Sequence, residues 1–238
     1  MDNAGYTTLA RQSGLMREMQ VVANNIANMA TGGFRKEGLI FSEYVQDLDG
    51  TAPSLSMATS NARMTSQMQG AVEQTGATFD LAIEGRGFFL IETPDGEALT
   101  RAGNFTPNAE GDLVTADGFR LLDAGGAPVF VPPDAEAISI AADGTLSADG
   151  QPLNQIGLWE PETVSDTTRR DGVLFTLDAP PVPVENGVVL QGFLEASNVN
   201  PVAEISRMID VQRAYELGQG FLDKEDERIR GVLKTLGS

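Results

Sequence analysis

The 238-residue chain contains neither cysteine nor histidine. Disulfide bonds, thiol nucleophiles and every catalytic arrangement that depends on cysteine or histidine are therefore excluded. Most zinc and haem sites are excluded as well, because these two residue types supply their usual ligands.

Long hydrophobic runs are also missing. No run of about 18 or more apolar residues occurs, so the sequence predicts no membrane-spanning helix. The N-terminus reads Met-Asp-Asn-Ala-Gly and shows no basic segment followed by an apolar stretch, so no secretory signal peptide is predicted. We expect no membrane insertion, and any export would follow a route that reads another signal.

Basic residues are scarce, and the formal net charge is −18. Residues 76–197 hold 20 acidic and 5 basic residues, whereas the stretches 1–75 and 198–238 are close to neutral. A strongly acidic surface stays soluble and repels nucleic acid, so no nucleic-acid partner is expected. The near-neutral ends are the parts that can pack closely in an assembly, although an acidic domain can also simply be a solvated one.

Both ends of the chain carry apolar side chains at helical spacing. The pattern predicts one helix over residues 2–30 and another from residue 201 to the end. Neither helix can bury its stripe alone, so we expect them to form a coiled-coil-like domain together or with neighbouring subunits. The predicted self-assembly residues of these stripes are Leu15, Met19, Val22, Ile26, Met29, Ile205, Met208, Tyr215, Leu222, Ile229 and Leu233.

Two asparagines, Asn24 and Asn28, belong to the same predicted assembly surface. They lie four residues apart and so share a helix face. Asparagine is a poor helix former, but its amide can bond across an interface and set register. The alternative is a polar strip that faces solvent.

Helix-end signals set the expected domain boundaries. Thr31-Gly32-Gly33 is expected to end the first helix, while Asn200 and Pro201 are expected to cap and start the last one, with Glu204 completing the cap. The predicted organisation is α+β and multidomain: an N-terminal helix in 1–35, an extended connector in 36–77, an all-β domain in 78–191 and a C-terminal helix in 192–238. The Ser-, Thr- and Ala-rich connector is expected to hold at most one strand.

The middle of the chain alternates short β-prone runs with tight-turn signals. Asp-Gly pairs occur at 95–96, 117–118, 143–144, 149–150 and 171–172, and an Asn-Gly pair at 186–187. Residues 111–118 and 144–150 resemble one another, which suggests a repeated hairpin. An all-β domain of eight to twelve short strands is the expected product.

Two stretches of the sequence partly match known binding motifs, but neither match is complete. Gly85-Arg86-Gly87 begins like a phosphate-binding loop, but Leu90 breaks the dinucleotide fingerprint. Residues 47–58 approach a calcium loop, but the glycine is misplaced and Ala58 stands at the twelfth position. We expect no catalytic residue, no metal site and no cofactor, and no enzymatic activity. Paired carboxylates for glycan hydrolysis remain an open alternative, because acidic residues are plentiful.

Blocks near both termini resemble the rod-and-hook axial proteins of bacterial flagella. Residues 23–28 (Ala-Asn-Asn-Ile-Ala-Asn) and 31–35 (Thr-Gly-Gly-Phe-Arg) are similar to the N-terminal signature of that family. Residues 195–200 (Glu-Ala-Ser-Asn-Val-Asn) and 212–216 (Gln-Arg-Ala-Tyr-Glu) are similar to its closing signature. Gly33 follows a glycine where the family often has proline or threonine before it.

A third block in the middle of the chain resembles the segment that rod and hook proteins share. It comprises residues 85–89 (Gly-Arg-Gly-Phe-Phe) and 100–105 (Thr-Arg-Ala-Gly-Asn-Phe). The short chain and its Met-Asp-Asn-Ala-Gly-Tyr-Thr start favour a proximal-rod member over a distal one. The motif residues expected in the β domain are Gly85, Gly87, Phe88, Phe89, Arg101, Gly103 and Phe105.

The resemblance implies a structural subunit of the flagellar basal-body rod. Such a subunit would be exported by the flagellar type III apparatus without a cleaved signal peptide. It would polymerise helically with itself and other rod proteins into the drive shaft that crosses the periplasm. The alternatives are a distal-rod or hook paralogue, or a secreted β-domain adhesin whose helices merely dimerise it.

Overall fold

The computed structural model describes residues 2–46, 55–163, 167–170 and 172–236. The chain separates into two compact units. The helical unit comprises residues 1–27, 36–66 and 199–238, and the β unit comprises residues 28–35 and 67–198. The α+β class predicted from the sequence is confirmed, with helices at both ends and a mainly β middle.

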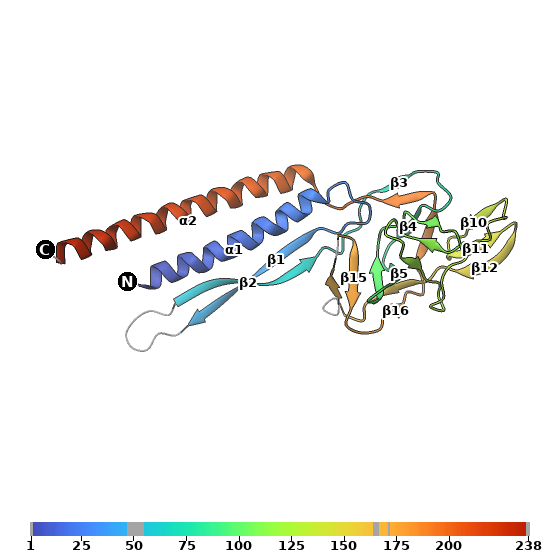
Figure 1. The fold of residues 1–238 in the computed structure, drawn as a ribbon, viewed down its shortest axis with the longest axis horizontal. Helices are drawn as coiled ribbons and strands as arrows, with labels where there is room; N and C mark the ends of the chain where they lie inside the picture. The colour runs from blue at the N-terminus through green and yellow to red at the C-terminus, as the bar shows by residue number, and fades with distance from the viewer. Residues whose placement is uncertain (1, 47–54, 164–166, 171, 237–238) are drawn as a thin grey trace. The chain divides into compact units, whose positions relative to one another are not determined.

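The helical unit contains two long helices, α1 (Asp2–Ala27) and α2 (Pro201–Leu236). They run antiparallel and side by side (Figure 1). Asn200 caps α2 as predicted, because its side-chain oxygen accepts a hydrogen bond from the amide of Ala203 at 3.1 Å. α1 ends at Ala27, three residues earlier than the sequence indicated.

An antiparallel hairpin completes the helical unit. Strand β1 (Glu37–Gln46) pairs with β2 (Leu55–Thr65) along its whole length, with a register shift at Ile40 and Phe41. This hairpin lies where the sequence suggested a connector with at most one strand. Both strands also contact α1, which supplies the cover that an isolated two-stranded hairpin lacks.

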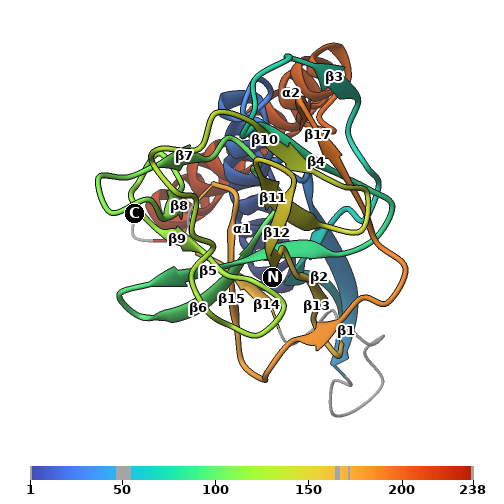
Figure 2. The ribbon, with the colours of Figure 1, turned by 90° about the vertical axis from the view of Figure 1, so that its right-hand side faces the viewer.

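The β unit is built around one nine-stranded sheet. Its main order is β14-β15-β6-β5-β9-β8-β7, and β13 pairs with both β5 and β16. Figure 2 shows β5 between β6 and β9. The strands are β5 (Phe88–Thr93), β6 (Gly96–Thr100), β7 (Thr106–Pro107), β8 (Leu113–Val114), β9 (Arg120–Leu121), β13 (Leu158–Glu160), β14 (Thr167–Arg169), β15 (Leu174–Leu177) and β16 (Val182–Pro183).

Three small sheets complete the β unit. They are β10-β11-β12 (Ile138–Ile140, Thr145–Ala148 and Gln151–Gln155), β17-β4 (Val188–Gln191 and Leu81–Glu84) and β18-β3 (Phe193–Glu195 and Val72–Gln74). Because of the β18-β3 pair, the β unit extends beyond both ends of the predicted β domain, residues 78–191. The glycines of all five Asp-Gly pairs have positive φ, as tight turns require.

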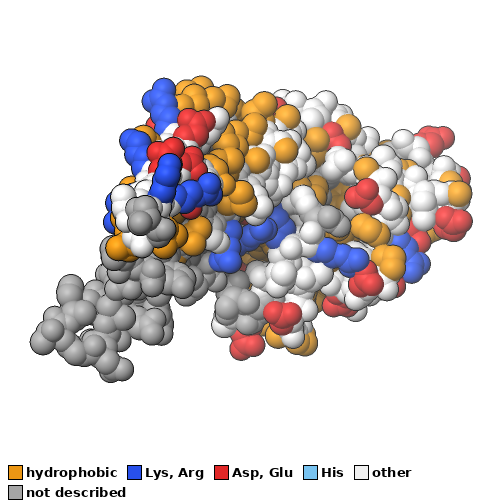
Figure 3. Space-filling model, turned by 60° about the vertical axis from the view of Figure 1, so that its left-hand side comes forward, with side chains coloured by type: hydrophobic (Ala, Val, Ile, Leu, Met, Phe, Trp, Pro, Cys, Tyr) orange, Lys and Arg blue, Asp and Glu red, His pale blue; other side chains and the backbone are white. Residues whose placement is uncertain are grey.

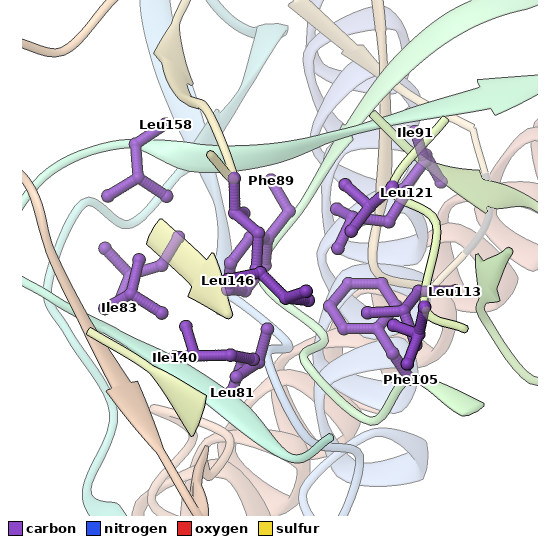
Figure 4. Packing of buried hydrophobic residues seen from close by; sticks show 14 of the residues in the cluster. Leu81, Ile83, Phe89, Ile91, Phe105, Leu113, Leu121, Ile140, Leu146 and Leu158 are labelled. Carbon is purple, nitrogen blue, oxygen red and sulfur yellow. The ribbon is translucent and has the colours of Figure 1, made fainter. Parts of the chain in front are cut away.

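One hydrophobic core fills the β unit. Leu81, Phe89, Leu113, Leu121 and Leu146 are fully buried and converge from several strands (Figure 4). A smaller cluster of Leu90, Leu99, Leu122 and Phe175 packs with Trp159. Close packing of this core makes the β unit rigid.

Candidate functional site

A buried ion cluster lies inside the β unit and consists of Arg35, Arg101 and Glu195. The two guanidinium groups each lie 3.0 Å from a carboxylate oxygen of Glu195, and all three side chains are about 3% exposed or less. The amide of Gly70 donates a further hydrogen bond to Glu195 Oε1 at 3.0 Å. We call this group the Glu195 cluster.

Backbone carbonyls satisfy most of the remaining arginine donors in the Glu195 cluster. Arg101 donates to the carbonyls of Ile83 at 3.2 Å and Gly85 at 2.5 Å. Arg35 donates to the carbonyls of Gln67 and Met68. Among the buried side-chain donors that the structure describes in this cluster, only the Nε atoms of Arg35 and Arg101 find no acceptor.

Burial dominates the electrostatics of this cluster. Loss of water lowers the pKa of Arg101 to about 10, and the nearby Glu195 carboxylate offsets only part of that effect. Burial also lowers the pKa of Arg35, again against the attraction of Glu195. Two cations thus share one buried anion, so the carboxylate is indispensable to both.

Glycines allow the chain segments of the cluster to approach one another. Gly33 has φ of 72°, and a Cβ there would lie 2.4 Å from the amide nitrogen of Ala102. Its own amide donates to the carbonyl of Glu195 at 2.7 Å. A Cβ at Gly103 would lie 1.7 Å from the carbonyl oxygen of Leu81. No other residue type fits at these positions without moving backbone.

The predicted motif residues of the β domain lie at the start of β5 and in the segment that follows β6. Phe89 and Phe105 are buried and pack edge to face at 5.3 Å. Phe88 is half-buried, and the guanidinium of Arg101 lies 5.3 Å from its ring centroid. Gly85 and Gly87 have positive φ on the loop that leads into β5. Sequence reasoning missed Arg35 and Glu195 as site residues, although both lie in the motif blocks that it quoted.

A second buried polar group lies inside the helical unit, where Asn25 joins α1, β1 and α2. Its amide donates to the carbonyl of Glu37 at 2.9 Å and to the carboxylate of Glu204 at 3.1 Å. Its side-chain oxygen accepts from the amide of Glu37 at 2.9 Å. Lys36 forms an ion pair with Glu204, so the carboxylate that was expected at the helix cap bonds to Lys36 and Asn25.

The asparagines that the sequence singled out are differently placed. Asn24 is half-buried and donates to the Glu37 carboxylate at 3.1 Å. Asn28 accepts a local hydrogen bond from the hydroxyl of Thr31 at 3.2 Å. The residue that bridges the helices is their neighbour Asn25, which is 1% exposed. Its place in the Ala-Asn-Asn motif was the available signal.

The predicted stripe residues divide by burial. Val22 is buried; Leu15, Met19, Ile26, Met208, Tyr215 and Leu222 are half-buried; Met29, Ile205, Ile229 and Leu233 are exposed. On α2, Glu204 and Gly218 face α1 and Val211 is buried; Glu204 lies one position before the predicted stripe residue Ile205. A one-residue offset is a turn of about 100° around the helix. Figure 3 shows the hydrophobic side chains left open beside charged ones on the helical unit.

No helix in the described ranges is long and apolar enough to cross a membrane. Nor do the described residues gather a group of acidic side chains that could hold a metal ion.

Comparison with known proteins agrees with the motif geometry. Two family models match, the flagellar hook protein FlgE/F/G D1 domain at residues 82–148 and the flagellar basal body rod FlgEFG protein C-terminal domain at residues 190–234. A flagellar basal-body rod protein FlgF from Caulobacter vibrioides is 40% identical over 100% of this chain and 99% of its own length. The chain belongs to the family of flagellar basal-body rod proteins.

Other relatives refine the position within this family. FlgF of Mesorhizobium japonicum is 37% identical over 100% of this chain and 99% of its own length. FlgG of Bacillus subtilis is 32% identical over 96% of this chain and 97% of its own length. The chain thus most resembles the FlgF members of the family. It is a structural protein of the flagellar basal body, not an enzyme, and the adhesin and glycan-hydrolase alternatives are not favoured.

Proposed function

We propose that the subunit polymerises helically with itself and other rod proteins into the torque-transmitting shaft, and that its terminal helices form the contacts between subunits. The observation that carries this proposal is an apolar surface on the helices that α1 and α2 do not bury against each other. Its exposed members are Leu9 and Met16 on α1 and Val202, Ile205, Ile209, Leu217, Phe221, Ile229, Val232, Leu233 and Leu236 on α2. Exposed apolar area of this extent favours burial in an assembly.

The distribution of charge supports the same proposal. The stretches that form the two helices are nearly neutral, whereas residues 76–197 carry most of the negative charge. Neutral helices can pack closely with their copies, while acidic β units repel one another and stay solvated. Of the predicted stripe residues, the exposed Ile205, Ile229 and Leu233 are the ones that we assign to contacts with neighbouring subunits.

The Glu195 cluster gives this function a mechanical element inside the β unit. It joins the segment that enters the unit, which contains Gly33 and Arg35, to the segment that leaves it, which contains Glu195. Arg101 links both to the main sheet through the end of β6. We propose that this tie keeps the entering and leaving segments together when the shaft carries load.

We also propose that the flagellar type III export apparatus delivers the subunit to the rod in the periplasm, as family membership suggests. In cells with an inactive export apparatus, the chain is expected to remain in the cytoplasmic fraction. Its recovery from the periplasm of such cells would argue against this route.

Substitution on the open helix surface tests the main proposal. We expect Ile229→Asp to abolish swimming, because a buried carboxylate would disrupt a subunit contact. The matched control is Ser206→Asp, which places the same charge at an exposed polar position of α2 and should leave swimming intact. Circular dichroism should show equal helix content in both. Normal swimming of the Ile229→Asp strain would contradict the proposal.

A further inference from the structure

A third arginine of the β unit contacts the segment by which the chain enters that unit. We call residues 28–35 the entering segment. Arg169 lies at the end of β14, and its guanidinium carbon lies 4.5 Å from the ring centroid of Phe34 and 4.7 Å from that of Phe175. One guanidinium nitrogen also donates a hydrogen bond to the carbonyl of Arg35 at 2.5 Å. Arg169 therefore joins two consecutive residues of the entering segment to the β14–β15 pair.

Arginine suits this place because its guanidinium is planar, permanently charged and rich in N–H donors. A planar cation can stack on aromatic faces while its N–H groups donate to carbonyls. Phe34 is fully buried and Phe175 is 4% exposed, so little water reaches either ring. Contacts between a cation and an aromatic ring are stronger when they are desolvated. The same guanidinium also donates to the carbonyl of Gly172, close to the start of β15.

Aromatic contacts extend from Arg169 into the Glu195 cluster. Phe175 packs edge to face against Phe88, with ring centroids 5.6 Å apart and an interplanar angle of 67°. The Arg101 guanidinium lies 5.3 Å from the centroid of Phe88, and one of its nitrogens lies 3.0 Å from a carboxylate oxygen of Glu195. These contacts form a closed network that consists, in order, of Arg35, Glu195, Arg101, Phe88, Phe175 and Arg169, which returns to the carbonyl of Arg35.

We propose that Arg169 is a positioning residue that acts together with the Glu195 cluster to hold the entering segment in place. Arg101 and Arg169 stabilise the same closed network through Phe88 and Phe175, so each should contribute more while the other is present. The β14–β15 pair, at one edge of the main sheet, is thereby a second hold on the entering segment. Its part in carrying load rests on the proposed function, whereas the coupling between the arginines is a property of the isolated chain.

Two backbone hydrogen bonds report whether the entering segment is held. The amide of Gly33 donates to the carbonyl of Glu195 at 2.7 Å, and the amide of Asn198 donates to the carbonyl of Phe34 at 3.3 Å. Both bonds join the entering segment to the segment that leaves the unit. A bonded amide exchanges its hydrogen with solvent when its bond opens, so exchange rates at these two positions measure release of the entering segment.

Hydrogen exchange in the full-length chain is the first test. Arg169→Met keeps an apolar stem but removes the cation and its donors. Loss of two contacts with buried rings should make the Gly33 and Asn198 amides exchange about ten-fold faster. The matched control is Arg170→Met, because the adjacent Arg170 pairs with Asp95 on the surface and its loss should leave both rates unchanged. Arg169→Lys keeps the charge without the planar group, so it should give intermediate rates.

A double-mutant comparison tests the coupling between the two arginines. The urea midpoint of the β unit would be followed by Trp159 fluorescence. The decrease in midpoint caused by Arg169→Met should be smaller in an Arg101→Met background than in the wild type, because the network is already open there. Arg170→Met should change the midpoint equally in both backgrounds.

Each outcome decides one part of the inference. Wild-type exchange at Gly33 and Asn198 in Arg169→Met would overturn the hold on the entering segment, and equal midpoint decreases in the two backgrounds would overturn the coupling. If Arg169→Met does not fold, Arg169→Lys carries both measurements, and wild-type behaviour of that variant would overturn the role of the planar group. All these results would leave the rod function intact, since that function fails only if basal bodies lack the chain.

Discussion

Replacement of Glu195 by glutamine should destabilise the β unit strongly. The carboxylate is 1% exposed and is the shared counter-ion of Arg35 and Arg101, each at 3.0 Å. A neutral amide of the same size leaves two buried cations without an anion and turns an NH₂ group toward one of them. Loss of one partner from a buried ion pair costs about 3–5 kcal/mol. For a chain of this size, that loss corresponds to a decrease in Tm of roughly 10 °C.

Trp159 provides the assay. It is the only tryptophan and belongs to the smaller hydrophobic cluster of the β unit, so its fluorescence reports that unit during urea unfolding. The control is Glu160→Gln, which removes a carboxylate that pairs with the 85% exposed Arg86. An exposed pair contributes about 1 kcal/mol or less, so the control should unfold almost like the wild type. Equal midpoints for Glu195→Gln and the control would refute the reasoning.

Three further predictions concern the close backbone approach at Gly33, the buried amide of Asn25 and the buried guanidinium of Arg101. Gly33→Ala should lower the unfolding midpoint of the β unit more than Gly76→Ala, because both have positive φ but only Gly33 has backbone within 3 Å of a new Cβ; equal shifts would rule out the steric explanation. Asn25→Ala should cost the helical unit about 1–3 kcal/mol for the polar groups left unpaired, measured by circular dichroism at 222 nm. Asn24→Ala, at a half-buried site, should cost less, and the reverse order would be inconsistent with the network described. The pKa of Arg101, about 10, lies below its ordinary value, so above pH 10 the unfolded state binds more protons than the folded state. Its contribution to stability should therefore increase as pH rises through 10 and decrease as pH falls through it; a wild-type minus Arg101→Met difference that shrinks with rising pH would contradict this sign.

Local signals predicted the parts of the fold that local chemistry decides. Asn200 and Pro201 marked the start of α2 because a capping side chain and a fixed φ act on their own few residues. The Asp-Gly pairs marked turns for the same reason. The family motifs were more informative than these local signals, because they linked distant blocks that the structure brings together around Glu195.

Long-range pairing explains what the sequence did not reveal. The β1–β2 hairpin has a Ser-, Thr- and Ala-rich second strand, and its existence depends on a partner nine or more residues away and on contact with α1. Hydrophobic periodicity also does not reveal that Glu204 and Gly218 face α1, because neither residue is apolar. The sequence alone cannot distinguish Arg35 and Glu195 from surface charges, because only the folded chain shows that they are buried together.

Quantitative mass spectrometry of purified hook–basal bodies from the source bacterium tests the central claim most directly. A structural rod subunit should be present in amounts comparable to those of other rod components and should be lost, together with swimming, in the Ile229→Asp strain. Intact basal bodies that lack this chain would contradict the rod function.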